Sequence, residues 1–149
     1  MILRSTAACA LPTSFSAADA QEVRALFLRQ AAAETAHDIF AIDQILARAA
    51  PGESDPVNFI ARAYRFWGRE AVMEHFRKTF LGIWRFEPDE AAIRIVSLGA
   101  NVAHIYAPTK ITIGAALEAG SPYQFLVNEI AIRTAAGWRI STIMPVPAQ

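Results

Sequence analysis

The sequence has one cysteine, no excess charge of either sign and no long apolar run, and each of these shortages excludes a class of protein. Cys9 is the only cysteine in 149 residues, so an internal disulfide is excluded and the redox compartment stays open. Fourteen basic and fourteen acidic side chains leave no net charge, so nothing attracts phosphate backbones or anionic lipids. No stretch approaches the roughly 18 consecutive apolar residues of a membrane span. We therefore expect neither nucleic acid nor a membrane as partner.

The sequence also lacks the motifs of metal, nucleotide and hydrolase sites. His37, His75 and His104 lie far apart, and the Glu-x-x-His spacing of Glu34 and His37 has no second copy, which a di-iron centre needs. There is no Gly-x-Ser-x-Gly turn, no phosphate loop and no Gly-x-Gly-x-x-Gly turn. We expect no metal, nucleotide or other cofactor.

Apolar residues are abundant, at 54% of a chain whose length suits one domain, and they must be buried in a core or an interface. The first 16 residues contain an arginine, a short apolar run and small residues, as a cramped export signal does, but Pro12 interrupts the run. We expect residues 1–16 to be the flexible tail of a cytoplasmic protein or, alternatively, the remnant of an export signal. Residues 17–149 are expected to form the domain.

A helical region follows the tail. Ser16 and Asp19 have the spacing of a capping box, which predicts a helix start there. Apolar residues recur at helical spacing, together with one glutamine, in two groups: Val23, Leu26, Phe27 and Gln30, then Ile42, Ile45, Leu46 and Ala49. Residues 17–50 contain no glycine or proline. They therefore predict either one long helix or two helices with Asp38 as the second N-cap.

Extended segments dominate the rest of the chain. Runs rich in β-branched and aromatic residues predict strands at residues 57–64, 92–98, 102–113, 124–134 and 138–146, with one helix after Gly68. Adjacent strands joined by short turns favour an antiparallel sheet with helices packed on one face. The sequence therefore predicts a single α+β domain.

Four segments carry a resemblance to a known family. They are FWGREAV at residues 66–72, the helix that holds His75, LGANVA at residues 98–103 and GWRI at residues 137–140. Together they resemble the SnoaL-like group of the ketosteroid isomerase and nuclear transport factor two-like superfamily. The resemblance implies a curved sheet wrapped around helices, a cystatin-like cone with an apolar pocket at its open end, and a homodimer formed through the outer sheet face. The activities of that group range from isomerases, cyclases and dehydratases to binding modules, so the fold alone selects none.

His75 is the first candidate for a catalytic base. In its helix Val72, Met73, Phe76 and Phe80 form one apolar stripe, and His75 lies at the edge of that stripe. A histidine there either lines the pocket mouth and transfers protons, or packs with one hydrogen bond. Related sequences carry a His-Asn pair near the end of the last strand. Here that end reads Met-Pro-Val at residues 144–146, so a partner for His75 is missing.

Asp55 is the second candidate, and it also has two interpretations. The run Asp-Pro-Val at residues 55–57 matches the segment that carries the proton-shuttling aspartate of ketosteroid isomerases. An Asp-Pro turn that opens a strand explains the same residues, and we favour it because the first helix lacks the tyrosine that the isomerases use as oxyanion donor. On the strand at residues 124–134, alternation puts either Asn128 or Glu129 inside. We favour Asn128 inside, with Glu129 in a surface or cross-strand pair with an arginine.

The predicted function is that of a SnoaL-like small-molecule pocket protein. Its chemistry would be cofactor-free proton transfer on a hydrophobic or aromatic substrate, of the isomerase, cyclase or dehydratase type, with Asp55 or His75 as the base. The residues expected to bind the ligand are Tyr64, Trp67, Phe76, Tyr106 and Asn128. The alternative is a non-catalytic ligand-binding or dimerisation module. The two differ in whether several ionisable groups converge in the pocket.

Overall fold

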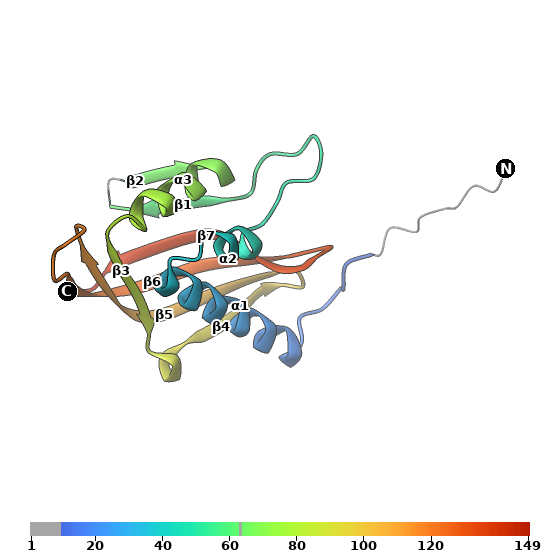
Figure 1. Ribbon diagram of the computed structural model, residues 1–149. Helices are drawn as coiled ribbons and strands as arrows, with labels where there is room; N and C mark the ends of the chain where they lie inside the picture. The colour runs from blue at the N-terminus through green and yellow to red at the C-terminus, as the bar shows by residue number, and fades with distance from the viewer. Residues whose placement is uncertain (1–9, 63) are drawn as a thin grey trace.

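A curved sheet with helices on its concave face makes up the domain (Figure 1). The computed structural model describes residues 10–62 and 64–149. Most of the predicted tail, residues 1–9, lies outside the described residues, so the tail, the export signal and the cytoplasmic location stay predictions.

The first helix begins where the capping box predicts. Helix α1 spans Ala17–Ala36, with Ser16 as N-cap. The Ser16 hydroxyl accepts a hydrogen bond from the Asp19 amide at 3.2 Å, and the Asp19 carboxylate accepts one from the Ser16 amide at 2.8 Å. These two bonds satisfy amides that the helix itself leaves unpaired.

The helix ends after Ala36 and a second one begins at Ile39, so the single long helix is wrong and the two-helix alternative is confirmed. His37 adopts a left-handed conformation, with φ 55°, and ends α1. Asp38 then caps α2 (Ile39–Ile45), because its side chain accepts a hydrogen bond from the Ala41 amide at 3.0 Å. No helix in the described part of the chain is long and apolar enough to cross a membrane.

In the described part of the chain, seven strands form one mixed sheet in the order β2-β1-β7-β6-β5-β3, and β4 pairs with β5 as well. The elements after α2 are β1 (Asn58–Ala61), β2 (Tyr64–Trp67), α3 (Arg69–Thr79), β3 (Ile83–Pro88), the 3-10 turn η1 (Glu90–Ala92), β4 (Arg94–Gly99), β5 (Val102–Gly114), β6 (Ser121–Thr134) and β7 (Gly137–Pro147). The predicted α+β class with a curved sheet is confirmed.

Three details of the sheet differ from the expectation. The pair β1 and β7 is parallel, whereas the other pairs between the described strands are antiparallel. The predicted strand at residues 57–64 covers β1 and only the first residue of β2, two short strands that pair as a hairpin, and β3 was not predicted at all. A parallel pair joins segments far apart in the chain, which local patterns do not report.

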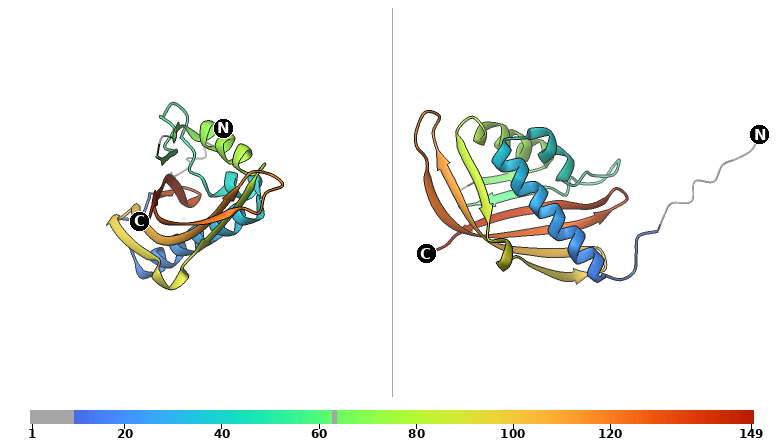
Figure 2. Two further views of the ribbon diagram at one scale, coloured as in Figure 1. Left: turned by 90° about the vertical axis from the view of Figure 1, so that its left-hand side faces the viewer. Right: turned by 60° about the horizontal axis from the view of Figure 1, so that its bottom comes forward.

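Helix α1 lies across the concave face of the sheet, with α2 and α3 beside it (Figure 2). The side chains between them form one apolar core, and its largest fully buried apolar members are Leu26, Phe27, Ile42, Leu46, Phe76, Ile105, Ile111, Ile140 and Ile143. At the start of α1 the Asp19 carboxylate also pairs with Arg133 at 2.8 Å and accepts a hydrogen bond from the Trp138 indole at 3.3 Å. These contacts fasten the amino end of α1 to the sheet. The other end of the cone remains open toward α3.

Candidate functional site

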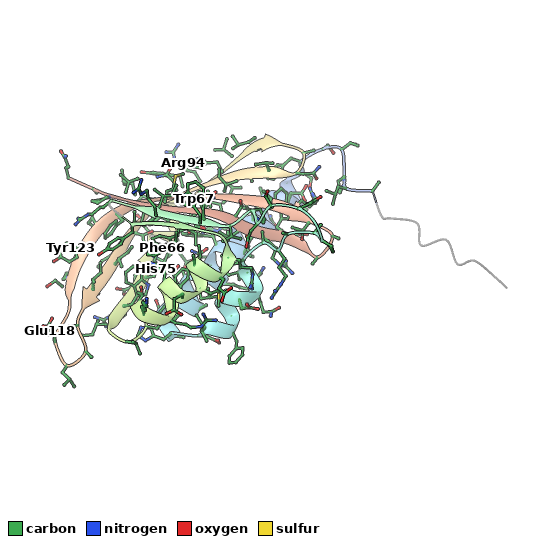
Figure 3. The ribbon with its side chains drawn as sticks, turned by 90° about the horizontal axis from the view of Figure 1, so that it is seen from above. Phe66, Trp67, His75, Arg94, Glu118 and Tyr123 are labelled. Carbon is green, nitrogen blue, oxygen red and sulfur yellow. The ribbon has the colours of Figure 1, made fainter. Side chains whose placement is uncertain are left out.

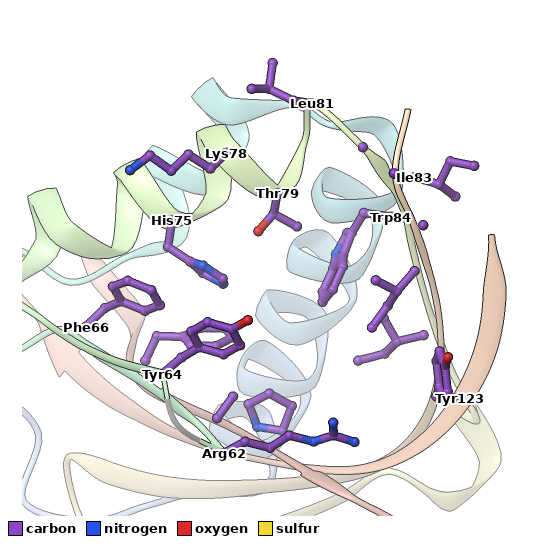
Figure 4. A pocket seen from close by; sticks show the side chains of 18 of the residues that line it. Arg62, Tyr64, Phe66, His75, Lys78, Thr79, Leu81, Ile83, Trp84 and Tyr123 are labelled. Atoms are coloured by element: carbon purple, nitrogen blue, oxygen red, sulfur yellow. The ribbon is translucent and has the colours of Figure 1, made fainter. Parts of the chain in front are cut away.

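A pocket of about 1090 Å³ opens between α3, the β1-β2 hairpin, the start of β3, the end of β5 and the first half of β6 (Figure 4). Its wall is mostly apolar and aromatic; the larger such side chains are Phe59, Tyr64, Phe66, Leu81, Ile83, Trp84, Ile111, Ile113, Tyr123 and Phe125. The polar or charged side chains of the wall, besides the tyrosines and Trp84, are Arg62, Glu74, His75, Lys78 and Thr79. A cavity of this size and composition suits a small hydrophobic molecule.

His75 points from α3 into the pocket, between aromatic rings (Figures 3 and 4). Its ring centroid lies 4.4 Å from that of Phe59 and 4.5 Å from that of Phe66. No described residue hydrogen bonds with its ring nitrogens. Burial without a compensating partner lowers the pKa of His75 to about 4, because the charged form loses its water. At neutral pH the ring is therefore uncharged, with one nitrogen that donates and one that accepts.

Trp84 connects the pocket wall to a buried polar cluster. Its ring lines the pocket, and its indole N–H donates a hydrogen bond to Glu34 Oε2 at 2.8 Å. Glu34 Oε1 accepts a second bond from the Gln30 amide nitrogen at 2.9 Å. The same nitrogen donates its other hydrogen to Glu129 Oε1 at 2.7 Å. One amide thus bridges two carboxyl groups, one on α1 and one on β6.

Both carboxyl groups of this cluster favour the protonated form. Glu34 is 2% exposed and Glu129 is fully buried. Burial raises the pKa of Glu34 to about 7, although its bonds to Gln30 and Trp84 oppose the rise. Burial, and then the neighbouring charge of Glu34, raise the pKa of Glu129 well above its usual range. Neither group lines the pocket, so the cluster supports the wall rather than touching a ligand.

Asp55 lies outside the pocket and caps a helix. Its two carboxylate oxygens accept hydrogen bonds from the Val57 amide at 3.1 Å and from the Arg69 amide at 2.7 Å. Helix α3 begins after Gly68, which has no side chain to cap it, so Asp55 supplies the cap from the preceding turn. Its side chain is exposed and does not line the pocket. This geometry is that of the turn we favoured.

The prediction that Asn128 faces inward is wrong. Asn128 lies on the outer face of the sheet, where its side-chain oxygen bonds with His104 at 3.0 Å, and Glu129 is the residue that points inward. Tyr106 pairs with Asn128 and lies on the same outer face, so it does not line the pocket either. Alternation misled the assignment because both faces of β6 carry apolar residues.

The other predicted ligand contacts divide between pocket, core and surface. Tyr64 lines the pocket as expected. Trp67 is 66% exposed and lies on the opposite side of β2 from Phe66 (Figure 3). Phe76 is fully buried in the core beneath the pocket and is not part of the wall. The apolar stripe of α3 therefore provides packing, and His75 at its edge lines the cavity together with Glu74 and Lys78 of the same helix.

Sequence reasoning missed Phe59, Arg62 and Trp84 as pocket residues. Phe59 on β1 and Trp84 on β3 reach the same pocket although β7, β6 and β5 lie between their strands in the sheet, and the strand of Trp84 was not predicted. The aromatic residues of WRF at residues 84–86 were a usable strand signal. Within residues 10–62 and 64–149 no group of three or more His, Cys, Asp or Glu side chains is arranged to hold a metal ion.

Comparisons with known proteins identify the fold. No protein-family model matches the chain, and no match is found among curated proteins. Solved structures do match. A protein named as a candidate aromatic ring hydroxylase from Novosphingobium aromaticivorans superposes with a TM-score of 0.77 at 13% identity, over 91% of this chain and 93% of that chain.

Two further solved structures carry the fold name. An NTF2-like superfamily protein from Salmonella enterica serovar Typhimurium gives a TM-score of 0.75 at 18% identity, over 89% of this chain and 93% of that one. A protein named as a candidate dehydratase of the NTF2-like family from Streptomyces avermitilis gives 0.74 at 15% identity, over 88% and 97%. The chain therefore has the NTF2-like, cystatin-like fold. The narrower SnoaL-like resemblance stays a prediction.

Proposed function

We propose that the pocket binds a small, flat hydrophobic molecule and that His75 hydrogen bonds with it. The observation that carries this proposal is an imidazole ring with no hydrogen-bond partner among the described residues, held between aromatic rings inside an apolar cavity. Stacked aromatic side chains favour a planar ligand, and a neutral histidine offers it both a donor and an acceptor.

Binding is better supported than catalysis by the ionisable groups. A general base works best with a pKa near the operating pH, whereas the pKa of His75 is about 4. Asp55 is committed to the cap of α3, and the two buried glutamates lie behind Trp84. Of the other ionisable side chains of the described pocket wall, Glu74 already pairs with Arg77 and Lys78, and none forms a hydrogen bond or ion pair with His75.

Cofactor-free proton transfer by His75 is the second candidate function. Its support is the accessible ring nitrogen and the candidate dehydratase among the structural neighbours. A ligand group that accepts a hydrogen bond from the protonated ring, such as a carboxylate or carbonyl oxygen, would raise the pKa of His75 toward neutrality. The test follows exchange of protons from a bound ketone in deuterated water. Exchange that the wild type shows and that His75→Gln loses, while it still binds the ketone, would establish this function.

The binding proposal is tested with two matched ligands and one variant. Isothermal titration measures the Kd of 2-methylnaphthalene and of 2-naphthol for the wild type and for His75→Phe, which keeps a flat ring and removes the nitrogens. We expect both ligands to bind the wild type. Only 2-naphthol should bind the variant more weakly, by about fivefold to tenfold for one hydrogen bond. Failure of both ligands to bind the wild type would contradict the proposal.

We also propose that the chain forms a homodimer through the outer face of the sheet. Val96 and Val146 are each 48% exposed there, and the half-buried Tyr106, Leu126 and Met144 lie between them on paired strands. An apolar patch of this kind is typical of an interface. Light scattering at micromolar concentration should report a dimer for the wild type and a monomer for Val146→Lys. A monomeric wild type would contradict the proposal.

A further inference from the structure

We propose that the ligand of this pocket is an amphiphile, with a flat apolar body and an anionic head group that Arg62 binds. This inference rests on the proposed binding function and adds the chemical class of the ligand. It depends on the backbone at Arg62, on the charges of the pocket wall and on the arrangement of the cations around the cavity.

Arg62 is held in an unfavourable conformation at the pocket wall. It lies in the turn between β1 and β2 and has φ 52°, in the left-handed region. Side chains with a Cβ rarely adopt this region, and glycine is the usual choice at such a turn. Residues held there against local preference gather at ligand sites. Here the backbone conformation accompanies a guanidinium group that lines the cavity.

The charges of the wall leave Arg62 without an acidic partner. Arg62 and Lys78 are the cations of the wall, and Glu74 is its carboxylate. Glu74 is 3.6 Å from Lys78 and 3.5 Å from Arg77, so it already serves two cations on α3. Among residues 10–62 and 64–149, no carboxylate lies within ion-pair distance of Arg62. The pocket therefore has an excess of positive charge, and Arg62 carries it.

The arrangement suits a ligand with two chemically different ends. Figure 4 shows the Arg62 side chain on the side of the pocket opposite Lys78, with Tyr64 and His75 directed into the space between. A flat body can stack in the aromatic part of the wall near His75 while a head group reaches Arg62. A guanidinium pairs best with a planar carboxylate, which it binds through two parallel hydrogen bonds. The favoured ligands are aromatic or other hydrophobic carboxylic acids.

The experiment compares 2-naphthoate with 2-naphthol, which share the ring system and differ in the head group. Isothermal titration at low salt measures both ligands on the wild type, on Arg62→Gln and on a control, Arg65→Gln. Arg65 is a matched control because it is an exposed arginine of the same hairpin. It pairs with Ile60 on the face of β2 opposite to Phe66 and does not line the pocket.

We expect Arg62→Gln to weaken the affinity for 2-naphthoate at least tenfold and to change the affinity for 2-naphthol by less than twofold. Arg65→Gln should change neither ligand by more than twofold. Arg62→Gly provides a second test, since glycine accepts the left-handed backbone and removes only the side chain. It should reproduce the selective loss with the melting temperature unchanged or raised.

Three outcomes would overturn the inference. In the first, Arg62→Gln loses affinity equally for both ligands. In the second, Arg65→Gln loses as much affinity for 2-naphthoate as Arg62→Gln does. In the third, Arg62→Gly shows no selective loss of affinity for 2-naphthoate. In each of these the wild type still binds 2-naphthol, so the proposed pocket function stands. If the wild type binds neither compound, the pocket function fails together with the anionic head group.

Discussion

The substitution Glu34→Gln tests the buried carboxyl cluster most directly, because it removes the titration and keeps the shape of the side chain. An amide at position 34 can still accept the hydrogen bond from the Trp84 indole through its oxygen. Its nitrogen can donate to the Gln30 side-chain oxygen once the Gln30 amide turns over, because that oxygen has no partner among the described residues and a protonated Glu129 can then donate to it. The cluster should therefore survive the substitution, and the fold with it.

The expected effect depends on pH with a definite sign. The pKa of Glu34 is about 7 when folded, against an ordinary value of 4.5, so the folded protein holds a proton that the unfolded chain has released. This contribution to the free energy of unfolding is complete below pH 4.5 and disappears as the pH rises through 7. A shift of this size corresponds to about 3 kcal/mol, of which about 2 kcal/mol is lost between pH 5 and pH 8. The glutamine variant lacks that loss.

Urea unfolding at pH 5, 6, 7 and 8 measures the effect as a difference between variant and wild type, in which the groups common to both largely cancel. We expect the two proteins to agree within about 1 kcal/mol at pH 5, and the variant to be more stable by about 2 kcal/mol at pH 8. Glu22→Gln, on an exposed position of the same helix, is the control and should show no such trend. If the free energies of unfolding of Glu34→Gln and the wild type differ by the same amount from pH 5 to pH 8, Glu34 does not hold a proton in the folded protein.

Three further predictions concern His75, Asp55 and Asp19. The folded pKa of His75 is lowered to about 4, so the wild type should lose stability as the pH falls from 6.5 toward 4. Between pH 7 and pH 5 the free energy of unfolding, measured in urea, should fall by about 1 to 2 kcal/mol more for the wild type than for His75→Phe, with allowance for the partial exposure of the ring. Equal changes in the two proteins would count against this prediction. Asp55→Asn should reduce stability by about 1 kcal/mol through the weakened cap, with ligand affinity unchanged by calorimetry; loss of proton exchange from a bound ketone would make Asp55 a base instead. Asp19→Asn should lower Tm by several degrees in a calorimetric scan, because it removes the ion pair with Arg133 and weakens the cap of α1; an unchanged Tm would show that these contacts do not hold the helix to the sheet.

Much of the architecture could be predicted from local sequence alone. The spacing of Ser16 and Asp19 marks the start of α1, and Asp38 marks the second helix, because an N-cap needs only the residues next to it. The long strands β5, β6 and β7 show in their β-branched content and in the turns between them. The turn interpretation of Asp55 also depends on neighbours in the chain. Local energetics decides each of these features.

The site depended on contacts that only the tertiary structure forms. The choice between Asn128 and Glu129 could not be made on the strand itself, because the outer face of the sheet is as apolar as the inner one. Glu129 lies inside because Gln30, distant in sequence, offers it a hydrogen bond in the core. Arg62 and His75 acquire their environments in the same way, from strands and a helix that converge across the sheet. Burial, and the pKa changes that follow from it, are properties of that convergence, and the local sequence does not contain them.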